Sequence, residues 1–327
     1  MTLGPLTWLA GTPDDTARAV TIGVFDGVHL GHQALLQRLR EEAGPGLVPT
    51  VLTFDRHPLR VVAPEREPER LTADALRIEL LRQAGAAAVV ALPFDAAAAG
   101  LSPEAFVREV LIERLGARLA VVSSAFRFGA GGRGDPAALR RIGREQGLAV
   151  CEVPPRMLDG RRVSSTRIRQ ALKAGDVELA ARLLGRHHVV EGVVERGEGR
   201  GRALGFPTAN LGRLEVLAPA EGIYAAWARW AGEVRAAAVF IGRRLTFEGD
   251  RTIEAHLLDA DVELYGARLT LGFVRRLRDD RRFAGAQELA AQIARDVQAA
   301  RATLAPLLSA TPASAPCCHG PAGPSTR

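Results

Sequence analysis

The stretch Gly23-Val24-Phe25-Asp26-Gly27-Val28-His29-Leu30-Gly31-His32 decides how the first half of this 327-residue chain folds. It follows the apolar run 20–22 and leads into the periodic apolar run 33–39, an order that predicts a strand, a tight glycine loop and a helix. The start of such a helix offers backbone N–H groups and a positive dipole end. The stretch therefore predicts a binding site for a polyphosphate.

His29 and His32 are the candidate reactive groups of this loop, because residues three apart share one face of a helical turn. Histidines can donate hydrogen bonds to phosphate oxygens and to a leaving pyrophosphate, and glycines let the backbone approach the phosphates closely. A lone His-x-x-His is more often a structural or a metal pair. The strand, loop and helix setting with three glycines favours phosphate, and with it the transfer of a nucleotidyl group.

Composition fits an ordinary globular protein of two domains, with 47% hydrophobic and 24% charged residues. No run approaches the roughly 20 apolar residues of a membrane span, and the first residues do not resemble a secretory signal, so we expect a cytoplasmic protein without a membrane partner. The net charge of +6 comes from scattered arginines, with Lys173 as the single lysine, which does not favour nucleic-acid binding. Three cysteines argue against a disulfide framework: Cys151 reads as a core residue, and Cys317 and Cys318 stand in the tail without a second ligand pair.

Residues 20–154 alternate strand-like and helix-like runs, which predicts a Rossmann-like parallel sheet with helices on both faces. The expected strands are 48–54, 87–92, 118–122 and 148–153, and the expected helices are 73–83 with Thr72 as its N-cap, 102–116 and 136–146. Ligands bind at the carboxyl ends of such strands, where the histidine loop falls.

The pattern changes after a helical stretch, 165–184, that is interrupted at Gly175-Asp176. Short β-like runs at 189–190, 222–228, 234–241, 252–258 and 269–274 predict a small antiparallel barrel, followed by a helix over 286–304. We place the first domain at 1–184, the second at 185–306 and a disordered tail at 307–327.

A second phosphate element lies at Val163-Ser164-Ser165-Thr166-Arg167-Ile168-Arg169, where hydroxyls open a helix that carries arginines. Taken alone it reads as a capped surface helix. Together with the histidine loop it favours a phosphate chain.

In the second half, the glycine-dense segment 192–211 ends in Phe206-Pro207-Thr208-Ala209-Asn210. It is not a Walker loop, and by itself it could equally be a flexible hairpin. Thr208 and Asn210 alternate, so in an extended segment both point the same way, and two neutral oxygens on one face suit Mg²⁺ that is also bound by ATP phosphates. Glu254, on the strand-like run 252–258, could accept a proton from a substrate hydroxyl, or could belong to an exposed polar face.

These motifs resemble the bacterial bifunctional riboflavin kinase/FAD synthetase family. The histidine loop, Leu52-Thr53-Phe54-Asp55-Arg56-His57-Pro58, Phe126-Arg127-Phe128-Gly129 and Ser164-Ser165-Thr166-Arg167-Ile168-Arg169 match its adenylyltransferase half. Segments 205–210, 253–259, 264–266 and 277–283 match its riboflavin kinase half. The motifs occur in the same order as in the family, and the resemblance spans nearly the whole chain, to about Arg301.

The resemblance implies a transferase that makes FMN from riboflavin and ATP, and then FAD and pyrophosphate from FMN and ATP, with Mg²⁺ as cofactor. It implies catalytic roles for Glu254, His29 and His32, and Mg²⁺ binding by Thr208 and Asn210. Expected ATP or phosphate contacts are Gly23, Phe25, Asp26, Gly27, Gly31, Ser164, Ser165, Thr166, Arg169, Gly201, Gly205, Thr208 and Asn210. Expected flavin contacts are Phe126, Phe128 and Arg278. The partners are these small molecules, and the chain is expected to be a monomer or a weak homo-oligomer.

Two segments depart from the family pattern. Ser123-Ser124-Ala125 places Ala125 where the family has aspartate or asparagine, which motivates an alternative, a riboflavin kinase with a weakened or inactive adenylyltransferase domain. In 240–247, Phe240 and Leu245 replace the family's asparagine and proline, a change that could alter a pocket wall.

Overall fold

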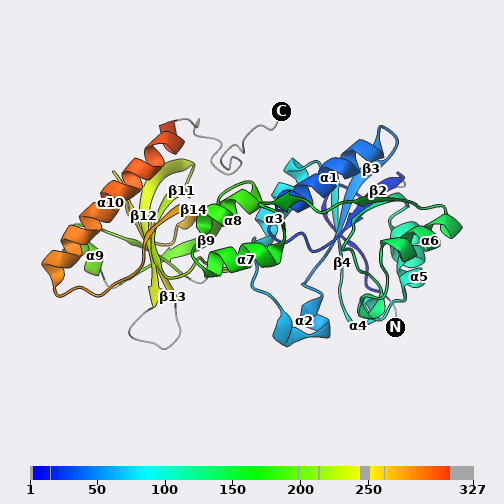
Figure 1. Ribbon diagram of the computed structural model, residues 1–327, viewed down its shortest axis with the longest axis horizontal. Helices are drawn as coiled ribbons and strands as arrows, with labels where there is room; N and C mark the ends of the chain where they lie inside the picture. The colour runs from blue at the N-terminus through cyan, green and yellow to red at the C-terminus, as the bar shows by residue number, and fades with distance from the viewer. Residues whose placement is uncertain are drawn as a thin grey trace. The chain divides into compact units, whose positions relative to one another are not determined.

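The computed structural model describes residues 3–14, 16–197, 199–212, 214–243, 251–260 and 262–309. The chain divides into two compact units, the first made of residues 1–69 and 73–164 and the second of residues 70–72 and 165–327 (Figure 1). Leu245, Cys317, Cys318 and most of the expected disordered tail lie outside the described residues.

The first unit is built on a six-stranded sheet with the order β1-β4-β3-β2-β5-β6. Its strands are β1 (Thr7–Ala10), β2 (Arg18–Ile22), β3 (Val48–Phe54), β4 (Ala88–Leu92), β5 (Ala117–Ser123) and β6 (Ala149–Val153). The pairs from β2 to β6 are parallel, which confirms the predicted parallel sheet. Strand β1 was not predicted, and it adds an antiparallel edge beside β4.

Helices cover both faces of this sheet, as predicted. On one face α1 (Leu30–Ala43) and α3 (Asp74–Gln83) supply Leu36 and Leu81 to a buried cluster; on the other, the π-helix η2 (Phe106–Arg114) and α6 (Pro136–Gln146) supply Val110 and Leu139. The shorter elements are α2 (Leu59–Val62), η1 (Pro64–Arg66), α4 (Ala96–Ala99), α5 (Pro103–Ala105), η3 (Ala130–Gly132), β7 (Met157–Leu158) and β8 (Arg161–Arg162). The core strands are buried on both faces, as parallel strands between helix layers must be.

Two of the predicted helix starts are confirmed and one is wrong. Ser102 and Asp135 accept hydrogen bonds from the N–H groups of Ala105 and Ala138, as N-cap residues do. Thr72 is not the cap of α3, because Ala73 occupies that position without a side-chain bond while Thr72 is buried. A local capping signal here gives way to burial of the threonine.

The second unit contains a closed antiparallel barrel with the order β10-β13-β12-β11-β14-β9. Its strands are β9 (His188–Glu195), β10 (Ala209–Leu211), β11 (Gly222–Trp230), β12 (Glu233–Arg243), β13 (Arg251–Leu257) and β14 (Arg268–Arg278). Its helices are α7 (Ser165–Lys173), α8 (Val177–Leu184), the short α9 (Arg200–Ala203) and α10 (Ala286–Ser309). The predicted antiparallel barrel is confirmed, and so is the predicted interruption at Gly175-Asp176, where Asp176 caps α8.

Helix α10 runs across the outer face of β11 and β12, where Ala225, Ala238, Val297, Ala300 and Leu304 form a buried cluster (Figure 1). The helix continues past Pro306 to Ser309 instead of ending near residue 304. Two leucines of its last turn, at 307 and 308, pack against the same cluster. This packing compensates for the backbone hydrogen bond that Pro306 cannot donate. Among the described residues, no helix combines the length and the apolar character needed to cross a membrane.

Candidate active sites

The histidine loop lies where the strand order of the first unit's sheet reverses. After β2 the chain adds β3 and β4 on one side of β2, and it then returns to add β5 and β6 on the other side. In open parallel sheets this switch point forms a crevice at the carboxyl ends of the strands, and ligands bind there. The loop that follows β2 and the segment that follows β5 flank this point.

His29 and His32 form a stacked pair at the start of α1. Their ring centroids are 3.6 Å apart with an interplanar angle of 15°, and the ring of Phe25 meets His32 edge-on at 5.1 Å. His29 is the N-cap residue of α1, and its Nδ1 accepts the backbone N–H of His32 at 3.3 Å. Since Nδ1 is an acceptor, the neutral ring carries its proton on Nε2, which is then a hydrogen-bond donor. The fold therefore fixes the tautomer that a phosphate oxygen requires.

The loop backbone adopts an uncommon conformation. Phe25, Gly27 and Val28 all have positive φ, at 55°, 88° and 39°. The N–H of Val28 donates to the carbonyl oxygen of Phe25, and Arg77 Nη1 donates to the carbonyl oxygen of Val24 at 2.9 Å. Positive φ at non-glycine residues costs free energy and is concentrated at functional sites. Asp26, in the centre of this turn, is only 7% exposed.

Gly23 and Gly31 are glycines because aromatic rings lie on them. A Cβ at Gly31 would lie 3.1 Å from the His29 ring, and one at Gly23 would lie 3.3 Å from the Phe25 ring. The same position at Gly31 is 3.6 Å from the carbonyl oxygen of Val163. The residue before Ser164 therefore lies beside the histidine loop.

The remainder of the second phosphate motif belongs to the other unit. Ser164 ends the first unit, whereas Ser165, Thr166 and Arg169 lie on the first turns of α7 in the second. Ser164, Ser165 and Arg169 are half-buried and Thr166 is exposed.

The aromatic segment after β5 contributes one accessible ring and one core ring. Phe126 and Phe128 stack at 5.4 Å with an interplanar angle of 10°, but Phe128 is only 6% exposed and packs into the sheet core. A Cβ at Gly134 would lie 2.6 Å from the Phe128 ring, so this ring packs directly on the glycine backbone. Phe126, half-buried, is the ring that a ligand can reach, and the neighbouring Ala125 is exposed.

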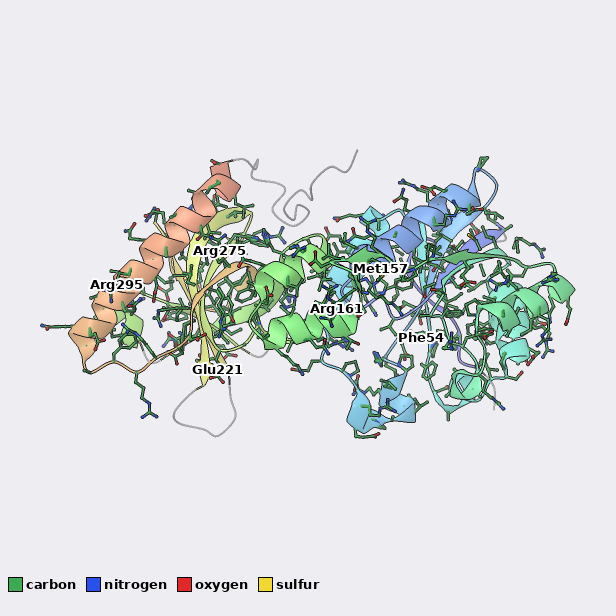
Figure 2. The ribbon with its side chains drawn as sticks, in the orientation of Figure 1. Phe54, Met157, Arg161, Glu221, Arg275 and Arg295 are labelled. Carbon is green, nitrogen blue, oxygen red and sulfur yellow. The ribbon has the colours of Figure 1, made fainter. Side chains whose placement is uncertain are left out.

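A further aromatic pair that the motifs did not single out lies at the carboxyl ends of β3 and β4. Phe54, which is labelled in Figure 2, meets Phe94 edge-on with ring centroids 5.2 Å apart. Asp55 accepts the N–H of Phe94 at 2.8 Å and pairs with Arg56. Partial burial raises the pKa of Asp55, but the hydrogen bonds from Arg56 and Phe94 outweigh it, and the net pKa is lowered. A phenylalanine at or just after the end of two successive expected strands, 48–54 and 87–92, is the sequence signal that could have indicated this pair.

In the second unit, the structure brings Thr208, Asn210 and Glu254 together. Asn210 on β10 pairs in register with Glu254 on β13, and the Thr208 hydroxyl donates to the Glu254 carboxylate at 3.2 Å. Directly opposed residues of an antiparallel pair share one face. The fold thus brings these three oxygen-bearing side chains together, although the sequence related only Thr208 and Asn210 to each other.

The glycine loop packs tightly on these groups. A Cβ at Gly197 would lie 2.3 Å from the Asn210 amide, and one at Gly201 would lie 2.4 Å from the carbonyl oxygen of Phe206 and 3.3 Å from the Thr208 side chain. Gly205 has a φ of 85°, which a residue with a side chain rarely adopts. The loop therefore needs glycine for close approach at two positions and for its turn at the third.

His256 positions the segment that carries Thr208. Its Nδ1 forms a hydrogen bond of 2.8 Å with the carbonyl oxygen of Pro207, and Phe206 meets its ring edge-on at 5.5 Å. Because a carbonyl only accepts, the ring nitrogen is the donor. His256 lies two residues after Glu254 on β13 and therefore shares its face, and the sequence motifs assigned it no role.

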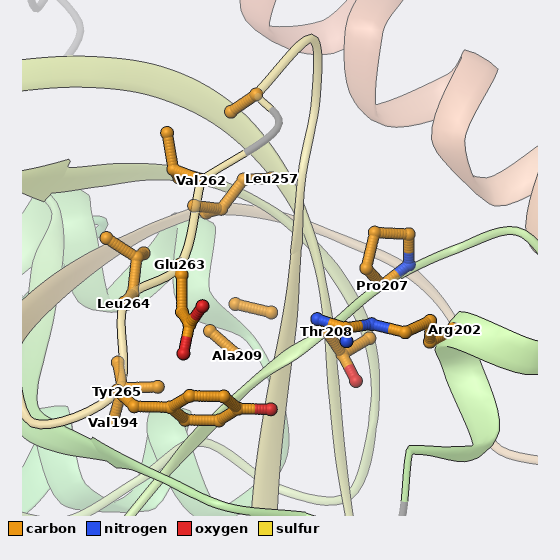
Figure 3. A pocket seen from close by; sticks show the side chains of 12 residues that line it. Val194, Arg202, Pro207, Thr208, Ala209, Leu257, Val262, Glu263, Leu264 and Tyr265 are labelled. Atoms are coloured by element: carbon orange, nitrogen blue, oxygen red, sulfur yellow. The ribbon is translucent and has the colours of Figure 1, made fainter.

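A cavity of about 230 Å³ lies beside Thr208, with Arg202 nearby and Glu263 and Tyr265 among its other walls (Figure 3). Arg196 lies over the Tyr265 ring, with its guanidinium carbon 5.5 Å from the ring centroid. The cavity lining comprises Val194, Arg202, Pro207, Thr208, Ala209, Ala255, Leu257, Ala260, Val262, Glu263, Leu264 and Tyr265. Apolar side chains such as Leu257 and Val262 line one end of the cavity beside the carboxylate of Glu263, and Arg202 and Thr208 line the other end, an arrangement that suits a base and a phosphate chain.

Arg278 is held by the protein. Its Nε and Nη2 bond to Asp296 on α10 and its Nη1 donates to the carbonyl oxygen of Asp279. Arg278 and Arg281 both lie over the Phe283 ring, with guanidinium carbons 5.7 and 4.8 Å from its centroid. A ligand near Arg278 would therefore meet a fixed guanidinium beside an aromatic ring.

Two family models match the chain in succession. The model described as FAD synthetase matches residues 12–167, and the model described as Riboflavin kinase matches residues 184–304. The two matches correspond to the sheet unit and the barrel.

Whole-chain relatives show the same pairing. The chain is 39% identical over 285 residues to the bifunctional riboflavin kinase/FMN adenylyltransferase of Escherichia coli K12, covering 86% of this chain and 91% of the relative. It is 40% identical over 303 residues to the enzyme of the same name from Pseudomonas fluorescens, covering 90% and 95%. A crystal structure named as a macrolide-efflux protein from Streptococcus pneumoniae superposes with a TM-score of 0.81 at 29% identity, covering 90% of this chain and 96% of that one.

Proposed function

The chain belongs to the bifunctional riboflavin kinase/FMN adenylyltransferase family, and from this we propose how its residues divide the two reactions. The enzyme phosphorylates riboflavin with ATP and transfers AMP from a second ATP to the resulting FMN. We assign the kinase step to residues 185–306 and adenylyl transfer to residues 1–184, with α7 and α8 packed on the barrel. The expected cytoplasmic location, and the expectation of a monomer or a weak homo-oligomer, stay predictions.

The hydrogen bond between Thr208 and Glu254, beside Asn210, carries the kinase assignment. In the reaction, the terminal hydroxyl oxygen of the ribityl chain attacks the γ-phosphorus of ATP, the bond from that phosphorus to the β,γ-bridging oxygen breaks, and ADP leaves. Glu254 accepts the hydroxyl proton. The Thr208 hydroxyl holds the carboxylate in position between the donor and the acceptor.

We propose Mg²⁺ as the cofactor, held at Thr208 and Asn210. In the described parts of the chain, no three His, Cys, Asp or Glu side chains gather as a metal site. A neutral hydroxyl and an amide oxygen beside one carboxylate still fit Mg²⁺, which keeps several waters and takes further oxygens from ATP phosphates. When bound there, the metal would neutralise charge on the transferring phosphoryl group.

The cavity beside Thr208 is our proposed site for the ATP of the kinase step. Its apolar end would hold adenine and its polar end, at Arg202 and Thr208, would hold phosphates. Gly201 and Gly205 would bring the loop backbone close to the phosphates. The close packing at Gly201 and the positive φ of Gly205 support this role.

For adenylyl transfer, we propose that the stacked His29 and His32 contact the triphosphate at the start of α1. An oxygen of the FMN phosphate attacks the α-phosphorus, the bond to the α,β-bridging oxygen breaks, and pyrophosphate leaves. The ring protons and the helix N-terminus stabilise the charge on the leaving group. Phe126 and Phe128 are the proposed flavin contacts, with Phe126 as the accessible ring and Phe128 as its support.

The test is incubation of the full chain with riboflavin, ATP and Mg²⁺, with the flavin products separated over time. FMN should appear first and FAD second. Glu254→Gln should abolish FMN formation while supplied FMN is still converted to FAD, and His29→Ala should have the opposite effect. Loss of both activities in both variants would contradict the two-site assignment.

A further inference from the structure

A single row of side chains crosses five strands of the barrel. Strands β10, β13, β12, β11 and β14 are consecutive neighbours. Their registers align Asn210 with Glu254, Glu254 with Phe240, Phe240 with Ile223 and Ile223 with Arg278. The row therefore links the proposed catalytic base to Arg278 through two residues, Phe240 and the buried Ile223.

This row lies on the outer face of the barrel, the face on which Ala225 and Ala238 pack against α10, whereas Phe240 and Glu254 are only half-buried. Along β12, Val239 and Ile241 are fully buried and point to the interior. Ala238 points the other way, into the cluster that it forms with α10. Phe240 alternates with Val239 and Ile241 and so shares the face of Ala238. Glu254, opposite Phe240, shares that face as well.

The ring of Phe240 extends along its own strand over Gly242. A Cβ at Gly242 would lie only 2.2 Å from the ring's Cζ, so the ring covers the backbone at this glycine. Phe240 is half-buried, which leaves part of the ring open to a ligand. The barrel thus presents an aromatic surface next to a carboxylate, at a position where the family pattern has asparagine.

The row has dimensions that suit one particular acceptor. Neighbouring strands are about 4.8 Å apart, so the three steps from Glu254 to Arg278 span about 14 Å. A flat tricyclic ring with a five-carbon polyol chain has a similar length. An acceptor that lies along the row would place its ring over Phe240 and its terminal hydroxyl at Glu254.

We propose that Phe240 determines the acceptor specificity of the kinase site by stacking on the flavin ring. The inference rests on the proposed function and deepens it, because it names the residue that recognises the ring as distinct from the chain of hydroxyls. Aromatic stacking stabilises the binding of a flat, apolar ring and does not stabilise a polar acceptor that lacks such a ring. Polyols that lack the ring are consequently poor substrates.

The test uses the full chain and the variants Phe240→Ala, Phe240→Asn and Phe240→Tyr. Steady-state kinase assays give KM for riboflavin, KM for ATP and kcat. Lumichrome, the flavin ring without its ribityl chain, serves as a competitive inhibitor that reports on ring binding alone. Conversion of supplied FMN to FAD in the same samples, together with thermal melting of the barrel, controls for folding.

Phe240→Ala and Phe240→Asn should raise KM for riboflavin and Ki for lumichrome by the same factor, about tenfold, a loss equivalent to about 1.4 kcal/mol. KM for ATP and kcat should change less than about twofold, and Phe240→Tyr should restore both ring-dependent constants. Unchanged KM and Ki in active variants would overturn the inference, and so would a fall in kcat without a change in Ki. A wild-type chain that forms no FMN at all would refute the proposed function instead.

Discussion

Arg278 on β14 and Asp296 on α10 form a two-pronged ion pair, with Nε 2.9 Å and Nη2 2.7 Å from the carboxylate oxygens of Asp296. Asp296 is only 6% exposed, and its carboxylate also accepts a hydrogen bond of 2.8 Å from Gln292. The pair joins the outer helix to the strand at the end of the proposed acceptor row.

Asp296→Asn should lower the free energy of unfolding of the barrel by about 2 kcal/mol, because a guanidinium loses its buried counter-charge. Urea denaturation followed by the fluorescence of Trp227 and Trp230 measures this. The matched control is Asp259→Asn, which breaks the exposed pair between Asp259 and Arg301 on the same helix and should have little effect. Equal losses of unfolding free energy in the two variants would show that burial does not make the Arg278–Asp296 pair more stabilising than the exposed pair.

Gly31→Ala should slow adenylyl transfer by about tenfold or more, because its Cβ would lie 3.1 Å from the His29 ring and displace it from the His32 stack. The rate of FAD formation from supplied FMN measures this, and the kinase activity should not change. Gly46→Ala is the control in the same unit, since a Cβ there meets nothing within 4 Å. Similar rates in the two variants would show that the position of the His29 ring does not matter.

Ala125→Asn should increase the rate of adenylyl transfer several-fold. Ala125 is exposed beside Phe126, so an amide there can reach a ligand without a steric penalty and restores the polar side chain that the family pattern has. Initial rates of pyrophosphate release with supplied FMN test the change. A rate that stays the same or falls would mean that Ser123 or Ser124 already supplies the missing hydrogen bond.

Acid should destabilise the barrel through His188. Burial lowers the pKa of His188 from 6.5 to about 4, with a smaller opposing effect from its hydrogen bond to the carbonyl oxygen of Leu217. The unfolded chain takes up the proton below pH 6.5 and the folded barrel does not. The stability is therefore complete above about pH 6.5 and falls as the pH drops towards 4, by at most about 3 kcal/mol.

Urea denaturation at a series of pH values between 7 and 4 measures this slope. His188→Gln, which keeps a hydrogen-bond donor for Leu217 but does not titrate, should flatten it. Buried His187, whose pKa burial also lowers, should leave a weaker residual slope. An equally steep slope in the glutamine variant would assign the acid sensitivity to other groups.

Local sequence signals predicted most of this fold because they coincide with its packing. Strand runs such as 48–54 are apolar on both sides, and Asp135-Pro136 is both a capping signal and the observed helix start. Strand β1 was missed because its four residues form a strand only by pairing with β4, about 80 residues away in sequence. Strand β10 is absent from the predicted barrel strands because three extended residues carry no strand signal of their own, and their pairing with β9 and β13 makes them a strand.

The candidate sites were predictable wherever their residues are close in sequence or alternate along one strand. His29 and His32 follow from helical spacing, and Thr208 and Asn210 from strand alternation. Their link to Glu254 comes from register between distant strands, which no local pattern encodes. The cavity wall at Glu263 and Tyr265, and the row through Phe240, arise from the closed barrel for the same reason.

Strand β10 is three residues long, and it is the piece that completes the ring between β9 and β13. Asn210 lies within it, so the strand that closes the barrel also carries one of the proposed metal ligands. A barrel in which β10 is unpaired would therefore lack the proposed kinase site. A nucleotide that binds only the closed barrel stabilises the pairing of β10 with β9 and β13 by its binding free energy. The substrate therefore increases the folding stability of this unit.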